Sequence, residues 1–137
     1  MQTQISPMLA VSDGKAAVAF YQAAFGAEVL WQIDAGGHVV AGLDIGGAQF
    51  FLSQESPPHG TRSPSAAGFT TVRIELFVDD PYAVFKRAVA AGATLREPVV
   101  EFDYTPIMAG PKPINKMLQG SVFDPSGHMW LIGKIIG

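Results

Sequence analysis

The sequence predicts an α+β fold made of two similar modules, each with the element order βαβββ. Two related segments carry this prediction: one opens at Val11-Ser12-Asp13 and closes at Gly26-Ala27, and the other opens at Val78-Asp79-Asp80 and closes at Gly92-Ala93. Each segment is followed by short apolar stretches, and each half of the chain ends in a turn and an apolar strand. A repeat spaced by about 67 residues indicates a duplicated supersecondary unit that sets the fold.

A polar linker separates the two modules. Residues 56–68 are rich in Pro, Ser and Gly, a composition typical of an exposed connection. We therefore expect module one at 1–55 and module two at 69–137, within a single domain spanning 1–137 that is long enough to bury one core. The second module has about 14 extra residues around 103–117, which predict a long loop. This loop could be a lid over a ligand or a tolerated insertion.

Module one is expected to begin with a strand at 5–11. A helix follows, because Ser12 or Asp13 can cap it, apolar residues recur every three or four positions, and Gly26 can end it. Glycine pairs then mark tight turns between three further strands. These strands are predicted at 28–33, 38–45 and 48–53.

Module two repeats this order. A strand at 70–78 precedes a helix at 81–91, whose first turn suits Pro81 because proline there lacks only an N–H that the helix does not use. The remaining strands are predicted at 94–101, 118–123 and 128–135.

The composition excludes several functional classes. The chain is 48% hydrophobic and 15% charged with a net charge of −3, and it has no cluster of Lys and Arg, so we expect no nucleic-acid partner. It has no cysteine and therefore no disulfide, thiolate metal site or Cys nucleophile. The N-terminus is unlike a signal peptide and no apolar run reaches membrane-spanning length, so a cytoplasmic protein without membrane contact is expected.

Two sequence motifs resemble those of the vicinal oxygen chelate superfamily, which includes glyoxalase I, extradiol dioxygenases and bleomycin-resistance proteins. They are AFYQAAFG at residues 19–26 and DPSGHMW at residues 124–130, and the likeness is greatest to the bleomycin-resistance branch and its PhnB-like relatives. The resemblance implies that the two modules form a curved mixed, mostly antiparallel sheet around a concave cavity, with the helices on the convex face.

The resemblance also implies where a metal would bind. Metalloenzymes of the superfamily take His or Glu ligands from one concave position on each of four strands, and the matching positions here are Ser6, Phe51, Arg73 and Leu131. None is a plausible ligand, and the Arg73 cation would repel a divalent metal. We therefore expect a metal-independent protein without a cofactor.

The alternation of side chains along the strands predicts which residues face the cavity. Arg73 and Glu75 share one face, where they could contact a ligand or pair with each other. We assign no catalytic residue, since the chain has neither a Gly-x-Ser-x-Gly motif nor a convincing Ser/His/Asp set. The predicted ligand-binding residues are Met8, Trp31, His38, Gln49, Phe51, Arg73, Glu75, Phe77, Tyr104 and Leu131.

An apolar cavity with a few polar groups is typical of a small-molecule site. With the resemblance, it predicts a homodimer that sequesters an aromatic or peptide-type antibiotic, as drug-binding resistance proteins do. A metal-independent isomerase, lyase or hydrolase with Glu75 or His38 as base is the alternative. A third possibility is an interaction domain whose concave face takes a peptide.

Overall fold

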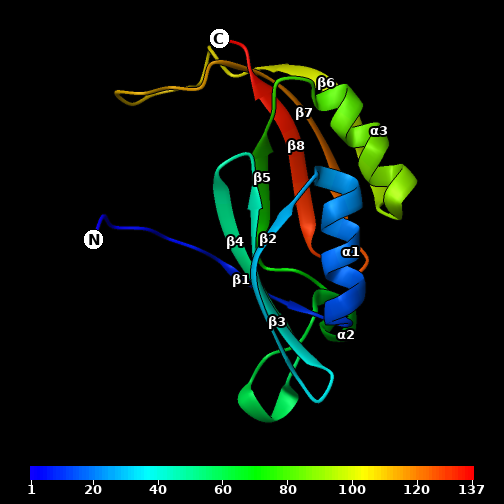
Figure 1. Ribbon diagram of the computed structural model, residues 1–137. Helices are drawn as coiled ribbons and strands as arrows, with labels where there is room; N and C mark the ends of the chain where they lie inside the picture. Colours follow the sequence, from blue (N-terminus) through cyan, green and yellow to red (C-terminus); the bar gives the residue numbers. More distant parts are fainter.

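The computed structural model describes residues 1–137 and has the predicted α+β architecture of two similar modules (Figure 1). Module one contains β1 (Met8–Val11), α1 (Gly14–Phe25), β2 (Glu28–Ala35), β3 (His38–Ile45) and β4 (Ala48–Gln54). The linker forms a single helical turn at Pro57–His59 and the short helix α2 (Pro64–Ala67). Module two contains β5 (Arg73–Phe77), α3 (Pro81–Ala91), β6 (Thr94–Asp103), β7 (Lys116–Phe123) and β8 (Met129–Ile135).

The strands form two four-stranded sheets with equivalent topology. Their orders are β1-β4-β3-β2 and β5-β8-β7-β6, so the duplication seen in the sequence is also present in the strand pairing. In each sheet the first and last strands of the module pair in parallel, and the other neighbours are antiparallel. Helices α1 and α3 lie on the same side of the strands (Figure 1).

The repeated residues at the ends of the helices are caps. Asp13 accepts a hydrogen bond from the backbone N–H of Ala16 at 3.0 Å, so Asp13 rather than Ser12 caps α1. Asp80 caps α3 in the same way through Ala83, at 3.1 Å. The similar sequences at these positions therefore reflect helix boundaries.

The two modules share one hydrophobic core. The indole of Trp130 on β8 lies 5.4 Å from the Tyr21 ring, 4.9 Å from the Phe25 ring and 5.5 Å from the Phe50 ring, measured between centroids. These three partners belong to module one and Trp130 belongs to module two. Trp130 is 2% exposed, so this aromatic cluster binds the modules into one unit.

A buried carboxylate completes this core. Asp124 Oδ2 accepts hydrogen bonds from the Tyr21 hydroxyl and, at 3.0 Å, from the Trp130 indole N–H. Asp124 Oδ1 accepts from the backbone N–H groups of Ser126 at 2.9 Å and His128 at 3.0 Å. Asp124 is 4% exposed, and these four donors replace the water that it loses. The DPSGHMW motif is therefore a structural joint between the modules.

Three local predictions differ from the structure. The first strand begins at Met8 instead of residue 5, since Pro7 lacks a backbone donor. The linker contains helical turns, and the Ser63 hydroxyl caps α2 by accepting from Ala66 N–H at 3.3 Å. The strand predicted at 70–78 is shorter, because β5 begins only at Arg73, and Val72 before it is 61% exposed. No helix has both the length and the hydropathy needed to cross a bilayer.

Candidate functional site

The face of the sheets opposite the helices carries the predicted site residues, and we call it the open face. On β4, Phe50 and Leu52 are buried in the core, while Phe51 points to the other side and is half-buried. On β5, Leu76 is buried and Glu75 is exposed on the opposite side. The predicted alternation on these strands is therefore confirmed, and the open face carries Phe51 in one sheet and Glu75 in the other.

A cavity of about 350 Å³ lies on the open face of the second sheet, and we call it the β5–β7 cavity. It is lined by Arg73, Glu75 and Phe77 from β5, by Met117 and Gln119 from β7, and by Tyr104, Met108 and Ile114 from the loop between β6 and β7. The loop that the sequence marks as an insertion therefore forms one wall. This arrangement favours ligand contact over a merely tolerated insertion.

Arg73 and Glu75 form an ion pair inside this cavity. Arg73 Nε donates to Glu75 Oε1 at 2.7 Å, and the two side chains are 46% and 37% exposed. The two terminal nitrogens of Arg73 make no hydrogen bond within the chain. Pairing and ligand contact are thus compatible, because the pair leaves N–H groups available in the cavity.

The neutral polar groups of the cavity come from Tyr104 and Gln119. The Tyr104 hydroxyl donates to Gln119 Oε1 at 3.1 Å, which links the loop to β7. The Tyr104 ring stacks on Phe102 with 5.8 Å between centroids and 5° between planes. Tyr104 N–H also donates to Asn115 O at 2.6 Å, which closes the base of the loop. These contacts fix the loop wall at the β7 side of the cavity.

The open face of the first sheet carries a separate aromatic platform, formed by Met8, Phe51 and Trp31. Met8 and Phe51 are register partners, as are Phe51 and Gly42, and Gly42 and Trp31. The Trp31 and Phe51 rings are 5.2 Å apart. A Cβ at Gly42 would lie 2.4 Å from Trp31 Nε1, so the absence of a side chain there lets the indole lie against the backbone.

Three predicted residues line neither the β5–β7 cavity nor the aromatic platform. Leu131 is 1% exposed beside Glu75, so it supports the floor without presenting a surface. His38 pairs with Ala35 at the end of the β2–β3 hairpin, next to the turn. Gln49 accepts a hydrogen bond from Gln4 at 3.3 Å, and with Glu75 it lines a smaller cavity of about 170 Å³ where the two modules meet. The structure therefore brings together Arg73, Glu75, Phe77 and Tyr104, and separately Met8, Phe51 and Trp31.

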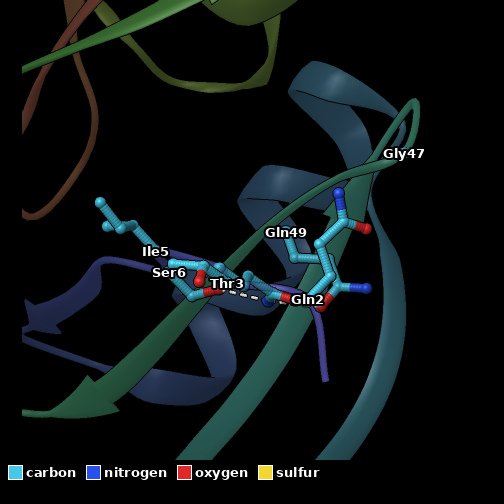
Figure 2. Close-up of a pocket in the computed structure, with 7 residues that line it drawn as sticks. Gln2, Thr3, Ile5, Ser6, Gly47 and Gln49 are labelled. Atoms are coloured by element: carbon cyan, nitrogen blue, oxygen red, sulfur yellow. Dashed lines mark hydrogen bonds between the residues drawn. The ribbon is translucent and has the colours of Figure 1, made fainter.

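A polar hollow of about 290 Å³ lies where the N-terminal segment meets the β3–β4 turn (Figure 2). Gln4 Nε2 donates to Ser6 Oγ at 2.7 Å and to Gln49 Oε1 at 3.3 Å. The single apolar residue that lines the hollow, Ile5, points away from the amide side chains (Figure 2). With neither a charge nor an apolar floor, this hollow suits an aromatic ligand less well than the β5–β7 cavity.

Four lining residues of the cavity are not among those predicted from the sequence: Met108, Ile114, Met117 and Gln119. Met117 and Gln119 lie on the same face of β7. Gln119 falls within the strand predicted at 118–123, and Met117 lies just before it, because β7 begins at Lys116. Met108 and Ile114 lie in the loop, where no periodicity predicts the direction of a side chain.

The side chains at the four positions where the resemblance would place metal ligands do not form a metal site. No group of three or more His, Cys, Asp or Glu residues lies close enough to hold an ion. The four positions considered from the sequence present a hydroxyl at Ser6, an aromatic ring at Phe51, a guanidinium at Arg73 and a buried aliphatic chain at Leu131. This donor set does not fit a divalent metal.

Comparisons with known proteins cover nearly the whole chain. The family model "Glyoxalase/Bleomycin resistance protein/Dioxygenase superfamily" matches residues 4–132. An uncharacterized protein from Mycobacterium bovis is 33% identical over 139 residues, which span 98% of this chain and 84% of that protein. The crystal structure of TioX from Micromonospora sp. ML1 is 26% identical with a TM-score of 0.66, covering 98% of both chains.

A second solved structure shows the same fold at lower identity. It is a glyoxalase/bleomycin resistance protein/dioxygenase family enzyme from Burkholderia phytofirmans PsJN, with a TM-score of 0.67 and 21% identity, covering 98% of this chain and 100% of that chain.

Proposed function

Since this chain belongs to the glyoxalase/bleomycin resistance protein/dioxygenase superfamily, we propose that it binds a small aromatic or apolar molecule without a metal. The β5–β7 cavity carries this proposal. Its lining combines the Phe77 ring and flexible thioethers with one ion pair and one amide, the usual composition of a small-molecule pocket. The finer proposal is that the ligand is an aromatic or peptide-type antibiotic, which the protein sequesters and leaves chemically unchanged.

The proposal includes a homodimer in which a second copy covers the open face. Large apolar side chains remain exposed on this face: Met8 is 55%, Phe77 41% and Trp31 39% exposed. The N-terminal segment and the β6–β7 loop both extend on the side of the strands away from the helices (Figure 1). Their residues Ile5 and Ile107 are 91% and 82% exposed, and burial of such side chains against a second copy would stabilise association.

The enzymatic alternative has less support. Glu75 is the one carboxylate lining the cavity, and its Oε1 already accepts from Arg73. His38, the other candidate base, lies at the end of a hairpin in the first sheet. The peptide-binding alternative also has less support, because a cavity of about 350 Å³ is not filled by the chain's own side chains.

Binding of the neutral dye phenylnaphthylamine, followed by its fluorescence, tests the proposed function. Replacing Phe77 with alanine is expected to weaken dye binding about tenfold, since a buried aromatic contact contributes roughly 1.5 kcal/mol. Tyr82→Ala is the matched control, because Tyr82 is an exposed aromatic residue on α3, outside the cavity. Equal affinities of Phe77→Ala and the unchanged protein, or no dye binding at all, would contradict the proposal.

A further inference from the structure

We propose that the β5–β7 cavity selects aromatic ligands that carry an acidic group, and that the terminal N–H groups of Arg73 bind this group. The inference rests on the proposed function, because it specifies the ligand class of the same cavity. A carboxylate, a sulfonate and a phosphate all meet this requirement, since all three present charged acceptor oxygens.

Glu75 fixes the orientation of the Arg73 side chain. Its Nε donates to Glu75 Oε1 at 2.7 Å, and both residues line the cavity. A guanidinium has five N–H groups in a planar fork, so this contact uses one and leaves the four terminal ones. A terminal pair of this kind matches the two oxygens of a carboxylate or sulfonate. Because Glu75 already holds the side chain, less conformational freedom is lost when a ligand binds.

The cavity has more free hydrogen-bond donors than free acceptors. Gln119 Oε1 accepts from the Tyr104 hydroxyl, so the amide nitrogen of Gln119 remains a donor. Glu75 has one oxygen, Oε2, that Arg73 does not bind. The free donors of Arg73 and Gln119 therefore outnumber the free acceptor of Glu75. An anion, which offers acceptors, complements these free donors better than an ammonium group, which offers donors only.

A second arginine, Arg96, lies on the same sheet. Arg96 and Glu97 on β6 pair with each other at 3.1 Å, and Arg96 also donates to Ser121 Oγ at 3.3 Å. Neither Arg96 nor Glu97 lines the β5–β7 cavity, so this pair does not contact a ligand bound there. The remaining lining residues, Phe77, Met108, Ile114 and Met117, are apolar and suit the ring system of the ligand. Of the charged side chains on this sheet, Arg73 and Glu75 line the cavity, and Arg73 is the cation of the two, so recognition of the acidic group is assigned to Arg73.

Two dyes with the same ring skeleton test this inference. Anilinonaphthalene sulfonate carries an acidic group, and phenylnaphthylamine lacks it. The unchanged protein is expected to bind the sulfonate about tenfold more tightly, as expected for hydrogen bonds to a charged group. Arg73→Gln should remove this preference, so that the variant binds the two dyes with equal affinity. High salt should reduce the preference, because both charges are partly exposed to solvent.

Three further variants separate direct contact from a general charge effect. Arg62→Gln removes the same charge from an exposed position in the linker and should keep the preference. The double variant Arg73→Gln with Glu75→Gln shows whether the loss of the sulfonate preference arises from removing Arg73 or from leaving Glu75 unpaired. The preference should be absent in the double variant. It should be present in Glu75→Gln alone. Thermal unfolding and far-UV circular dichroism confirm that each variant is folded.

The outcomes distinguish this inference from the proposed function. Equal affinities for both dyes in the unchanged protein, or a preference that survives in Arg73→Gln, would overturn the inference and leave the cavity a binding site. Failure to bind either dye would overturn both.

Discussion

Replacing Asp124 with alanine is expected to lower the free energy of unfolding by about 4 kcal/mol. The Asp124 carboxylate accepts hydrogen bonds from Tyr21, Trp130 and two backbone N–H groups. Alanine would leave these donors buried without an acceptor, and each such group costs about 1–3 kcal/mol. Because Tyr21 belongs to module one and Asp124 to the turn before β8, a hydrogen bond between the modules is lost at the same time. Urea denaturation measures the change.

The control for this experiment is Asp79→Ala. Asp79 is an exposed aspartate between β5 and α3, so its replacement should change the free energy of unfolding by less than about 0.5 kcal/mol. A loss below about 1 kcal/mol in Asp124→Ala would show that the joint between the modules does not depend on this carboxylate.

The stability of the protein is expected to fall steeply above about pH 10, through Tyr21. Burial raises the pKa of the Tyr21 hydroxyl well above its usual value, and the neighbouring Asp124 carboxylate raises it further. On the alkaline side of the usual tyrosine pKa, the unfolded chain therefore loses this proton while the folded protein keeps it. The folded state binds more protons, so the free energy of unfolding falls by up to about 1.4 kcal/mol per pH unit.

The variant Tyr21→Phe isolates this effect. It removes the titrating hydroxyl, so the difference in unfolding free energy between the unchanged protein and the variant should be constant below about pH 10 and shrink above it. Near neutral pH the variant should be less stable by about 1 kcal/mol, because it loses the hydrogen bond to Asp124. Parallel pH profiles of the two proteins would show that Tyr21 is not protected from ionisation in the folded state.

The sequence contains enough information for the fold, because local chemistry marks each boundary. Asp13 and Asp80 cap the two helices, and Gly26 and Gly92 end them with positive φ angles of 66° and 121°. The alternation along β4 and β5 also assigns the face of each side chain, because the core needs one apolar face.

The candidate site could be predicted only in part, because alternation gives the face of a residue but not its distance from another. His38 shares a face with the aromatic platform yet lies at the end of its hairpin. Trp31 follows a shift in register after Val29, which interrupts the simple pattern of β2. Whether Met108 and Ile114 reach the cavity depends on the path of the β6–β7 loop, which the sequence does not determine.

The separation of the site into two groups also has a physical origin. The strands form two four-stranded sheets, so residues on the open face of one sheet are not register partners of residues on the other. The aromatic platform and the β5–β7 cavity therefore lie on different sheets, although the sequence analysis treated them as one cavity.

Native mass spectrometry of the protein, purified from its own host and then mixed with anilinonaphthalene sulfonate, tests the central claim most directly. One spectrum reports the number of chains, any metal and any small molecule. We expect a dimer without metal that retains a small molecule or gains the mass of the dye. One divalent metal per chain, or a protein that never gains a small molecule at saturating dye, would contradict it.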